Sequence, residues 1–129
     1  MSYNILIVDD SRTTRTVIAK TLKLAGVSVN QLHEAENGKV ALGILEKTWI
    51  DLVFADINMP EMDGIEMIDQ MSKDGLTKLI PVVIVSTEGS QTRIEEMRAK
   101  GVKAYVRKPF TPELIKNIVE DILGENNAE

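Results

Sequence analysis

Acidic residues follow two short apolar runs of the sequence. Asp9 and Asp10 come directly after residues 4–8, and Asp56 comes directly after residues 52–55. A carboxylate in such a place can act as a nucleophile or as a ligand of a hard divalent cation. Each of these residues alone is more often a turn or helix-capping residue. Their chemistry therefore depends on which other groups the fold brings beside them.

A hydroxyl group and an ammonium group occupy corresponding positions later in the chain. Ser86 and Thr87 follow the apolar residues 81–85, and Lys108 follows residues 103–106. Alone, each would be interpreted as a turn or surface residue. Together with the acids, they place polar groups of defined chemistry after four separate runs, which is hard to obtain by chance.

The runs are expected to be strands, because short, continuous apolar runs rich in Val and Ile are typical of strands that are buried on both faces. A weaker alternation predicts one more strand, near an edge of the sheet. The strands are expected at residues 4–8, 29–35, 51–56, 81–85 and 103–106.

Helices are expected between the strands, because capping residues precede segments with apolar residues at helical spacing. These helices are expected to begin at Ser11, Asn37-Gly38, Asp63-Gly64, Ser90 and Thr111-Pro112. Their inward faces are expected to carry Val17, Ile18, Leu22 and Ala25; Val40, Ala41, Ile44 and Leu45; Ile65, Ile68 and Met71; Ile94 and Met97; and Leu114, Ile115, Ile118, Val119, Ile122 and Leu123. The helix that begins at Ser90 has the thinnest apolar stripe, as expected for an element that can move.

The alternation of strands and helices predicts an α/β fold of the (βα)5 type. Such a fold has one doubly wound, parallel, five-stranded sheet with right-handed crossovers and helices on both faces. Ligands bind to open sheets of this kind outside the carboxyl ends of the strands. If the first, third, fourth and fifth strands are neighbours, Asp9, Asp10, Asp56, Ser86 and Lys108 share one crevice.

Length and composition limit the possible functions. The 129 residues fit a single domain, 1–129, with residues 125–129 as a frayed polar tail. The formal net charge of −5 argues against nucleic acid as a partner. The sequence has no cysteine, and His33 is its one histidine, which excludes thiolate and His-rich metal sites. It has no long apolar run and no signal-peptide pattern, so we expect a cytoplasmic location and no membrane partner.

The crevice would bring like charges together. A pair of carboxylates about 4 Å apart repels by about 4 kcal/mol at an effective dielectric near 20. Either one acid stays protonated or a cation enters. Lys108 supplies one positive charge, and a set of oxygen ligands suits Mg²⁺. Such a site, flanked by a hydroxyl and a lysine, suits a phosphoryl group, which an aspartate can accept as an aspartyl phosphate.

Four segments of the chain resemble the receiver domains of response regulators, in the right order and over nearly the whole length. They are I-L-I-V-D-D, D-L-V-F-A-D-I-N-M-P-E-M-D-G, V-V-I-V-S-T-E and A-Y-V-R-K-P-F. The chain is most similar to single-domain chemotaxis receivers of the CheY type. The resemblance implies the flavodoxin-like strand order 2-1-3-4-5. It implies that Asp56 is the phosphoacceptor, and that Asp9, Asp10, Asp56 and the main-chain carbonyl of Asn58 hold Mg²⁺.

The resemblance also assigns roles to the later strand ends. Ser86 matches the hydroxyl residue that binds the phosphoryl group, and Lys108 matches the lysine that pairs with it. The peptide bond between Lys108 and Pro109 is expected to be cis. Tyr105 matches an aromatic switch residue that turns inward when the hydroxyl residue moves toward phosphate.

The chain departs from the family pattern at a few positions. Ser86 replaces the more usual threonine, and Thr87 is bulkier than the small residue often found there. The bulk of Thr87 is expected to slow the access of phosphodonors or to hinder Tyr105. Asn58 and Glu88 match positions that tune the loss of the phosphoryl group, and they suggest a short lifetime.

The implied function is that of a two-component response regulator. A CheA-like histidine kinase would phosphorylate Asp56 in a Mg²⁺-dependent reaction. The signal would pass through the fourth helix, fifth strand and fifth helix to a protein such as a flagellar motor switch or a phosphatase. The protein would not be an enzyme beyond catalysing its own phosphorylation and dephosphorylation.

Two other classes of function remain open from the residues. One is a small Mg²⁺-dependent phosphohydrolase with an aspartate nucleophile, although its usual D-x-D pair is absent because Asp9 and Asp10 are adjacent. The other is a flavodoxin-like nucleotide binder, in which Asp9 and Asp10 would repel the phosphate of the ligand.

Overall fold

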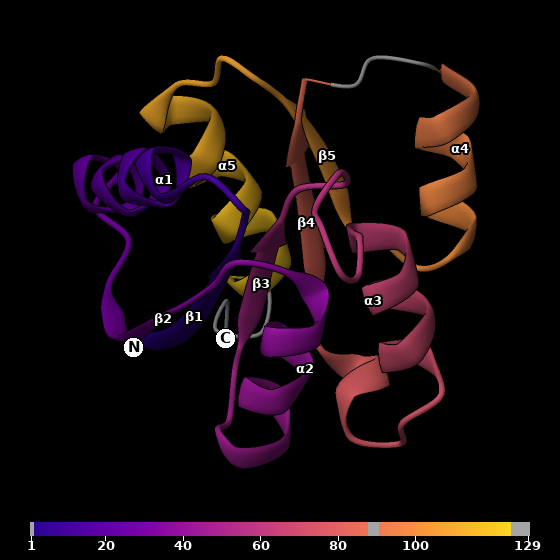
Figure 1. Ribbon diagram of the computed structural model, residues 1–129. Helices are drawn as coiled ribbons and strands as arrows, with labels where there is room; N and C mark the ends of the chain where they lie inside the picture. The colour runs from indigo at the N-terminus through magenta and orange to yellow at the C-terminus, as the bar shows by residue number, and fades with distance from the viewer. Residues whose placement is uncertain (1, 88–90, 125–129) are drawn as a thin grey trace.

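A five-stranded parallel sheet forms the centre of the computed structural model, which describes residues 2–87 and 91–124 (Figure 1). The strands lie in the order β2-β1-β3-β4-β5. They are β1 (Tyr3–Val8), β2 (Val29–Ala35), β3 (Leu52–Ala55), β4 (Val82–Ser86) and β5 (Ala104–Arg107). The helical segments are α1 (Arg12–Leu24), α2 (Gly38–Lys47), α3 (Gly64–Ser72), the 3-10 turn η1 (Thr77–Leu79), α4 (Gln91–Ala99) and α5 (Pro112–Leu123). The predicted α/β fold, its strand order and the edge position of β2 are confirmed.

Helices cover both faces of the sheet, as Figure 1 shows. Successive side chains of a strand point to opposite faces, so Ile5 and Ile7 pack with α1 and α5, whereas Leu6 and Val8 pack with α2, α3 and α4. Both faces of the central strands are therefore buried. This double burial is the reason why their sequences are continuously apolar rather than alternating.

Side-chain caps begin four of the helices where the sequence predicts them. In each case the cap accepts a hydrogen bond from the main-chain N–H three residues on, which satisfies a group that has no partner within the helix. The four pairs are Ser11 with Thr14, Asn37 with Val40, Asp63 with Glu66, and Thr111 with Leu114. These caps fix the loops that leave the carboxyl ends of the strands.

The expected inward faces are correct at their centres and wrong at their margins. Ile18, Leu22 and Ile115 are buried as predicted, but Val17, Val40 and Leu114 are exposed. Each exposed residue directly precedes a buried one and is rotated about 100° from it around the helix. The inward stripes are narrower than the apolar patterns suggest.

The helix α4 is held by few apolar side chains. Met97 is its only buried residue, and Ile94 is half-buried. The predicted thin stripe is therefore confirmed. The predicted cap of this helix, Ser90, lies outside the described residues, as does the expected tail at 125–129. Among the residues that the structure describes, no helix combines the length and the apolar character needed to cross a membrane.

Candidate functional site

The parallel pairing of β1 and β3 brings two of the predicted acids together. Val8 pairs with Ala55, so the residues that follow them, Asp9 and Asp56, leave neighbouring strands at the same edge. The main-chain N–H of Asp56 donates to the carbonyl of Val8 at 3.0 Å, which extends this alignment by one residue. Two positions that are distant in sequence thereby become adjacent.

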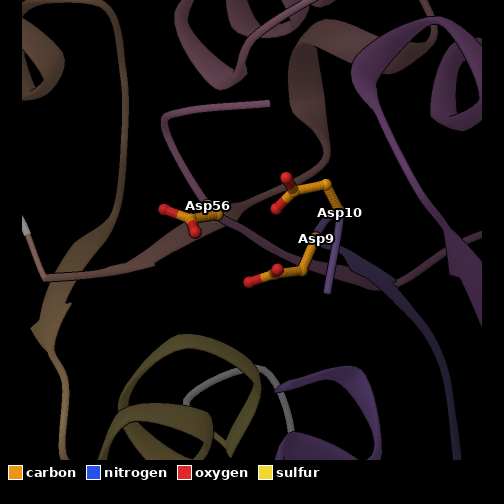
Figure 2. A group of neighbouring side chains, drawn as sticks. All are labelled: Asp9, Asp10 and Asp56. Carbon is orange, nitrogen blue, oxygen red and sulfur yellow. The ribbon is translucent and has the colours of Figure 1, made fainter. Parts of the chain in front are cut away.

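Three carboxylates gather at the carboxyl ends of β1 and β3 (Figure 2). One oxygen from each of Asp9, Asp10 and Asp56 lies within 4.8 Å of the others. Asp9 is 2% exposed, Asp56 is half-buried and Asp10 is exposed. The acid cluster, as we call these three residues, is therefore open to solvent on the side of Asp10.

Lys108 directly follows the edge strand β5 and reaches the acid cluster from there. Its ammonium nitrogen lies 3.2 Å from Oδ2 of Asp9 and 3.2 Å from Oδ2 of Asp56. The main-chain N–H of Lys108 donates to the carbonyl of Ser86, which holds the end of β5 beside the end of β4. The peptide bond from Lys108 to Pro109 is cis, as predicted.

The remaining predicted site residues lie around this cluster. Ser86, the last residue of β4, is 1% exposed, whereas Thr87 and Asn58 are exposed. Tyr105 pairs with Ile84 in the sheet, and its half-buried ring packs against the core shared with α2, α3 and α4. Glu88 lies outside the described residues. The structure thus brings Asp9, Asp10, Asp56 and Lys108 together, and their roles stay predictions.

Burial and neighbouring charges shift the pKa values of two residues at this site, Asp9 and Lys108. Burial raises the pKa of Asp9, and the charge of Asp56 raises it further, against the lowering effects of the Ser11 N–H and Lys108. For Lys108, burial lowers the pKa, but the charges of Asp56 and Asp9 outweigh it and the net pKa is raised. Lys108 therefore stabilises the fold below pH 10.5, and this stabilisation is lost as the pH rises through its raised pKa.

In the metal-free protein, ionisation of Asp9 is expected to lower the free energy of unfolding. Because its folded-state pKa is raised, the folded chain holds a proton that the unfolded chain has released, so stability falls as the pH rises through this window. Asp9→Asn should therefore raise the melting temperature at pH 7 in EDTA by a few degrees, since about 1 kcal/mol corresponds to roughly 4 °C at this size. The gain should shrink toward pH 4. A variant that melts lower than the wild type at pH 7 would contradict this account.

An arginine that the sequence analysis missed holds the turn after β1. The guanidinium of Arg15 donates from Nη1 to the main-chain carbonyl of Asp9 at 2.6 Å and from Nε to Glu34 Oε1 at 2.8 Å. It thereby ties α1 and β2 to the turn that carries the acids. No local signal predicts the contact with Glu34, because it depends on the pairing of β1 with β2.

The loop after Asp56 approaches its own strand too closely for a side chain at Gly64. The N–H of Gly64 donates to the carbonyl of Ile57 at 2.8 Å. A Cβ atom at this position would collide with the main-chain carbonyl oxygen of Asp56 and lie 3.2 Å from the Cα of Ile57. Glycine at position 64 therefore sets how the main chain of Asp56 is held.

Gly64→Ala is expected to lower the free energy of unfolding by about 1–3 kcal/mol, because backbone must move to relieve the collision. Gly43→Ala is the matched control. Gly43 lies within α2, where a Cβ atom would meet nothing within 4 Å, so alanine should stabilise by about 0.5–1 kcal/mol. Urea unfolding of the two variants measures both effects. Equal changes in the two variants would show that crowding at Asp56 is not the cause.

The acid cluster fits a magnesium ion by its donor set. It offers carboxylate oxygens alone, at a solvent-open edge where waters can complete the coordination, which is the arrangement that Mg²⁺ favours. One oxygen from each of the three residues lies within 4.8 Å of the others, so a single ion could be held by all three side chains.

Comparisons with known proteins agree with this architecture. The family model described as "Response regulator receiver domain" matches residues 5–120. The "Chemotaxis protein CheY homolog" of Campylobacter jejuni is 36% identical over 126 residues, which is 97% of this chain and 95% of that protein. The chemotaxis protein CheY of Pseudomonas aeruginosa is 37% identical over 124 residues, 96% and 98% of the two chains.

The solved structure of the Vibrio cholerae chemotaxis protein CheY4 has the same fold. It superimposes with a TM-score of 0.84 at 30% sequence identity and covers 95% of this chain and 100% of its own. The family match includes most of β1, the other four strands, and the residues that form the acid cluster and its lysine. The chain therefore belongs to the response regulator receiver domain family and is a response regulator of the CheY type.

Proposed function

We propose that this protein is a phosphorylation-driven switch that accepts a phosphoryl group on Asp56 from a histidine kinase. CheY-type receivers interact with histidine kinases and downstream targets, and they are signalling proteins rather than conventional enzymes. The observation that carries the proposal is the bridging position of Lys108. Its ammonium contacts both Asp9 and Asp56, so one cation faces the proposed acceptor and the proposed metal ligands together.

The two oxygens of Asp56 have different partners, which suggests how the acceptor is oriented. Oδ1 accepts a hydrogen bond from the N–H of Ile57 at 2.7 Å, and Oδ2 faces Lys108. In the transfer, a carboxylate oxygen of Asp56 forms a bond to phosphorus while the bond from phosphorus to the donor's imidazole nitrogen breaks. The imidazole nitrogen keeps the electron pair and takes up a proton from solvent.

Receiver domains bind Mg²⁺ at an acidic pocket, and here Asp9, Asp10, Asp56 and the carbonyl of Asn58 would hold it. The bound ion would supply positive charge to the oxygens of the transferred group. Lys108 would donate to one of these oxygens, and the hydroxyl of Ser86 would donate to another. Charge-assisted bonds of this kind are roughly twice as strong as neutral ones.

The new dianion would change the positions of β4, β5 and α4. Drawing Lys108 and Ser86 toward phosphate pulls on the ends of β5 and β4, which lie beside α4. Few buried side chains hold α4, so its rearrangement costs little. Shifting such a switch from 1:99 to 99:1 requires about 5.5 kcal/mol. Tyr105, on the strand between α4 and α5, would move inward in the phosphorylated state.

The relatives suggest the setting of the switch. Chemotaxis proteins of Campylobacter jejuni, Helicobacter pylori and Pseudomonas aeruginosa match this chain along nearly their whole length. A CheA-like kinase and a target such as a flagellar motor switch or a phosphatase are therefore the proposed partners. The phosphohydrolase alternative is not favoured, because the family that matches is a signalling family and the D-x-D pair is absent.

Incubation with acetyl phosphate tests the proposal. With Mg²⁺, the protein should gain one acid-stable, base-labile phosphoryl group per chain, measured by intact mass, and in EDTA it should gain none. A parallel assay with p-nitrophenyl phosphate should show no sustained turnover. Many turnovers of that ester, without a labelled protein, would support the hydrolase instead.

A further inference from the structure

Three of the most exposed apolar side chains of the described residues gather at the end of the sheet opposite the acid cluster. Leu76 is 79% exposed, Leu79 is 78% exposed and Trp49 is 67% exposed. Trp49 precedes β3, and the two leucines precede β4, so they lie at the amino ends of these strands (Figure 1). Exposed apolar groups that cluster in this way mark interaction sites more often than isolated ones do.

Two shallow grooves make these side chains one continuous surface. The first, of about 350 Å³, is lined by Trp49 and Leu79. The second, of about 320 Å³, is lined by Trp49 and Leu76. Both include Ile80, and Trp49 stands between them. A partner could therefore place apolar anchors on both sides of the indole ring.

The indole ring is exposed but held in place. Its N–H donates to Asp51 Oδ1 at 2.9 Å, and the carbonyl of Trp49 accepts from the side chain of Asn4 at 3.0 Å. The second oxygen of Asp51 accepts from the main-chain N–H of Asn4 at 2.8 Å. A fixed ring with its polar atom already bonded loses little entropy when a partner covers it. Tryptophan is also enriched among the residues that dominate binding energy.

Both carboxylate oxygens of Asp51 are already hydrogen-bonded, and the other charged groups in and beside the grooves are mostly positive, although the whole chain carries −5. Lys47 lines one groove, Lys103 lines the other, and the exposed Lys78 lies within η1 between Leu76 and Leu79. Besides Asp51, Glu46 is the other acid that lines the grooves. The amino-end patch is defined as Trp49, Leu76, Leu79, Lys47, Lys78 and Lys103.

We propose that the amino-end patch docks an acidic, amphipathic segment of a partner protein. Apolar side chains of the segment would fill the two grooves, and its carboxylates would meet the three lysines. A second copy of this chain fits less well, because its own patch would offer the three lysines only Glu46 as an acid that is not already bonded to Trp49 and Asn4. Because the patch lies at the opposite end of the strands from Asp56, docking would leave the acid cluster open to a phosphodonor.

The fluorescence of Trp49 tests this proposal, because it is the only tryptophan of the sequence. The probe is a synthetic helical peptide with Leu at i, i+3, i+4 and i+7 and Glu beside this stripe. Binding should shift the emission of Trp49 to the blue and protect it from acrylamide. The same peptide with Lys in place of Glu should bind at least about tenfold more weakly. Equal binding of the two peptides, or no response to either, would overturn the proposal.

Charge-reversal variants test whether the lysines of the amino-end patch bind the peptide. Lys78→Glu with Lys103→Glu should weaken the acidic peptide about tenfold, and Lys20→Glu on α1 should leave it unchanged. Asp56→Asn should bind the peptide like the wild type, so failure of the phosphorylation proposal would not affect this result. Two other outcomes would overturn the proposal by assigning the grooves to another occupant. They are dimerisation of the free protein that Leu79→Ser abolishes, and a red shift of Trp49 emission when residues 125–129 are deleted.

Discussion

Asp56→Asn is expected to abolish labelling by acetyl phosphate in the presence of Mg²⁺. The amide cannot attack phosphorus as a carboxylate does, and the change is otherwise nearly isosteric, so the fold should remain. Intact mass spectrometry should find one phosphoryl group on the wild type and none on the variant. The effect should be all-or-none, because none of the neighbouring groups is placed as Asp56 is, at the end of the central strand β3 and facing Lys108.

The control for this experiment is Asp121→Asn, an equivalent change on the exposed surface of α5. It should be labelled like the wild type. Thermal melting of both variants checks that neither has unfolded. Labelling of the Asp56 variant to the level of the wild type would mean that another residue accepts the phosphoryl group, and the assignment of Asp56 would be wrong.

Lys108→Gln is expected to slow phosphorylation by about 10²–10³-fold, the usual cost of removing one donor from a site that stabilises developing charge. The second expected consequence is a change in the affinity for Mg²⁺. Without the ammonium, Asp9 and Asp56 lose the cation that sits 3.2 Å from each, so their mutual repulsion favours another cation. Mg²⁺ should therefore bind the variant more tightly while the transfer becomes slower.

Lys20→Gln, an exposed position on α1, is the control. Mg²⁺ titration by calorimetry measures the affinity, and the rate of labelling at saturating Mg²⁺ measures the transfer. Slower labelling with weaker Mg²⁺ binding would indicate that the substituted glutamine disturbs the whole edge of the sheet. An unchanged rate would remove Lys108 from the mechanism.

Features that depend on a few neighbouring residues could be predicted from the sequence. Residues 5–8 and 52–55 are apolar at every position, and this pattern at such lengths is typical of a strand buried on both faces. Caps such as Ser11 and Asp63 act on N–H groups three residues away. Since each strand end is set by such local patterns, the sequence also determined that Asp9, Asp56, Ser86 and Lys108 stand at or next to carboxyl ends.

Tertiary structure decided what depends on neighbours that are distant in sequence. Whether the margins of a helix are covered depends on the elements packed beside it, so Val17 and Val40 could not be assigned from periodicity. The contact of Arg15 with Glu34 requires β2 beside β1, and the bridge from Lys108 to both carboxylates requires β5 beside β4 and β3 beside β1. The sequence determined which groups stand at the strand ends, whereas the order of the strands decided which of them touch, because hydrogen-bonded pairing alone brings residues so far apart in the chain within bonding distance.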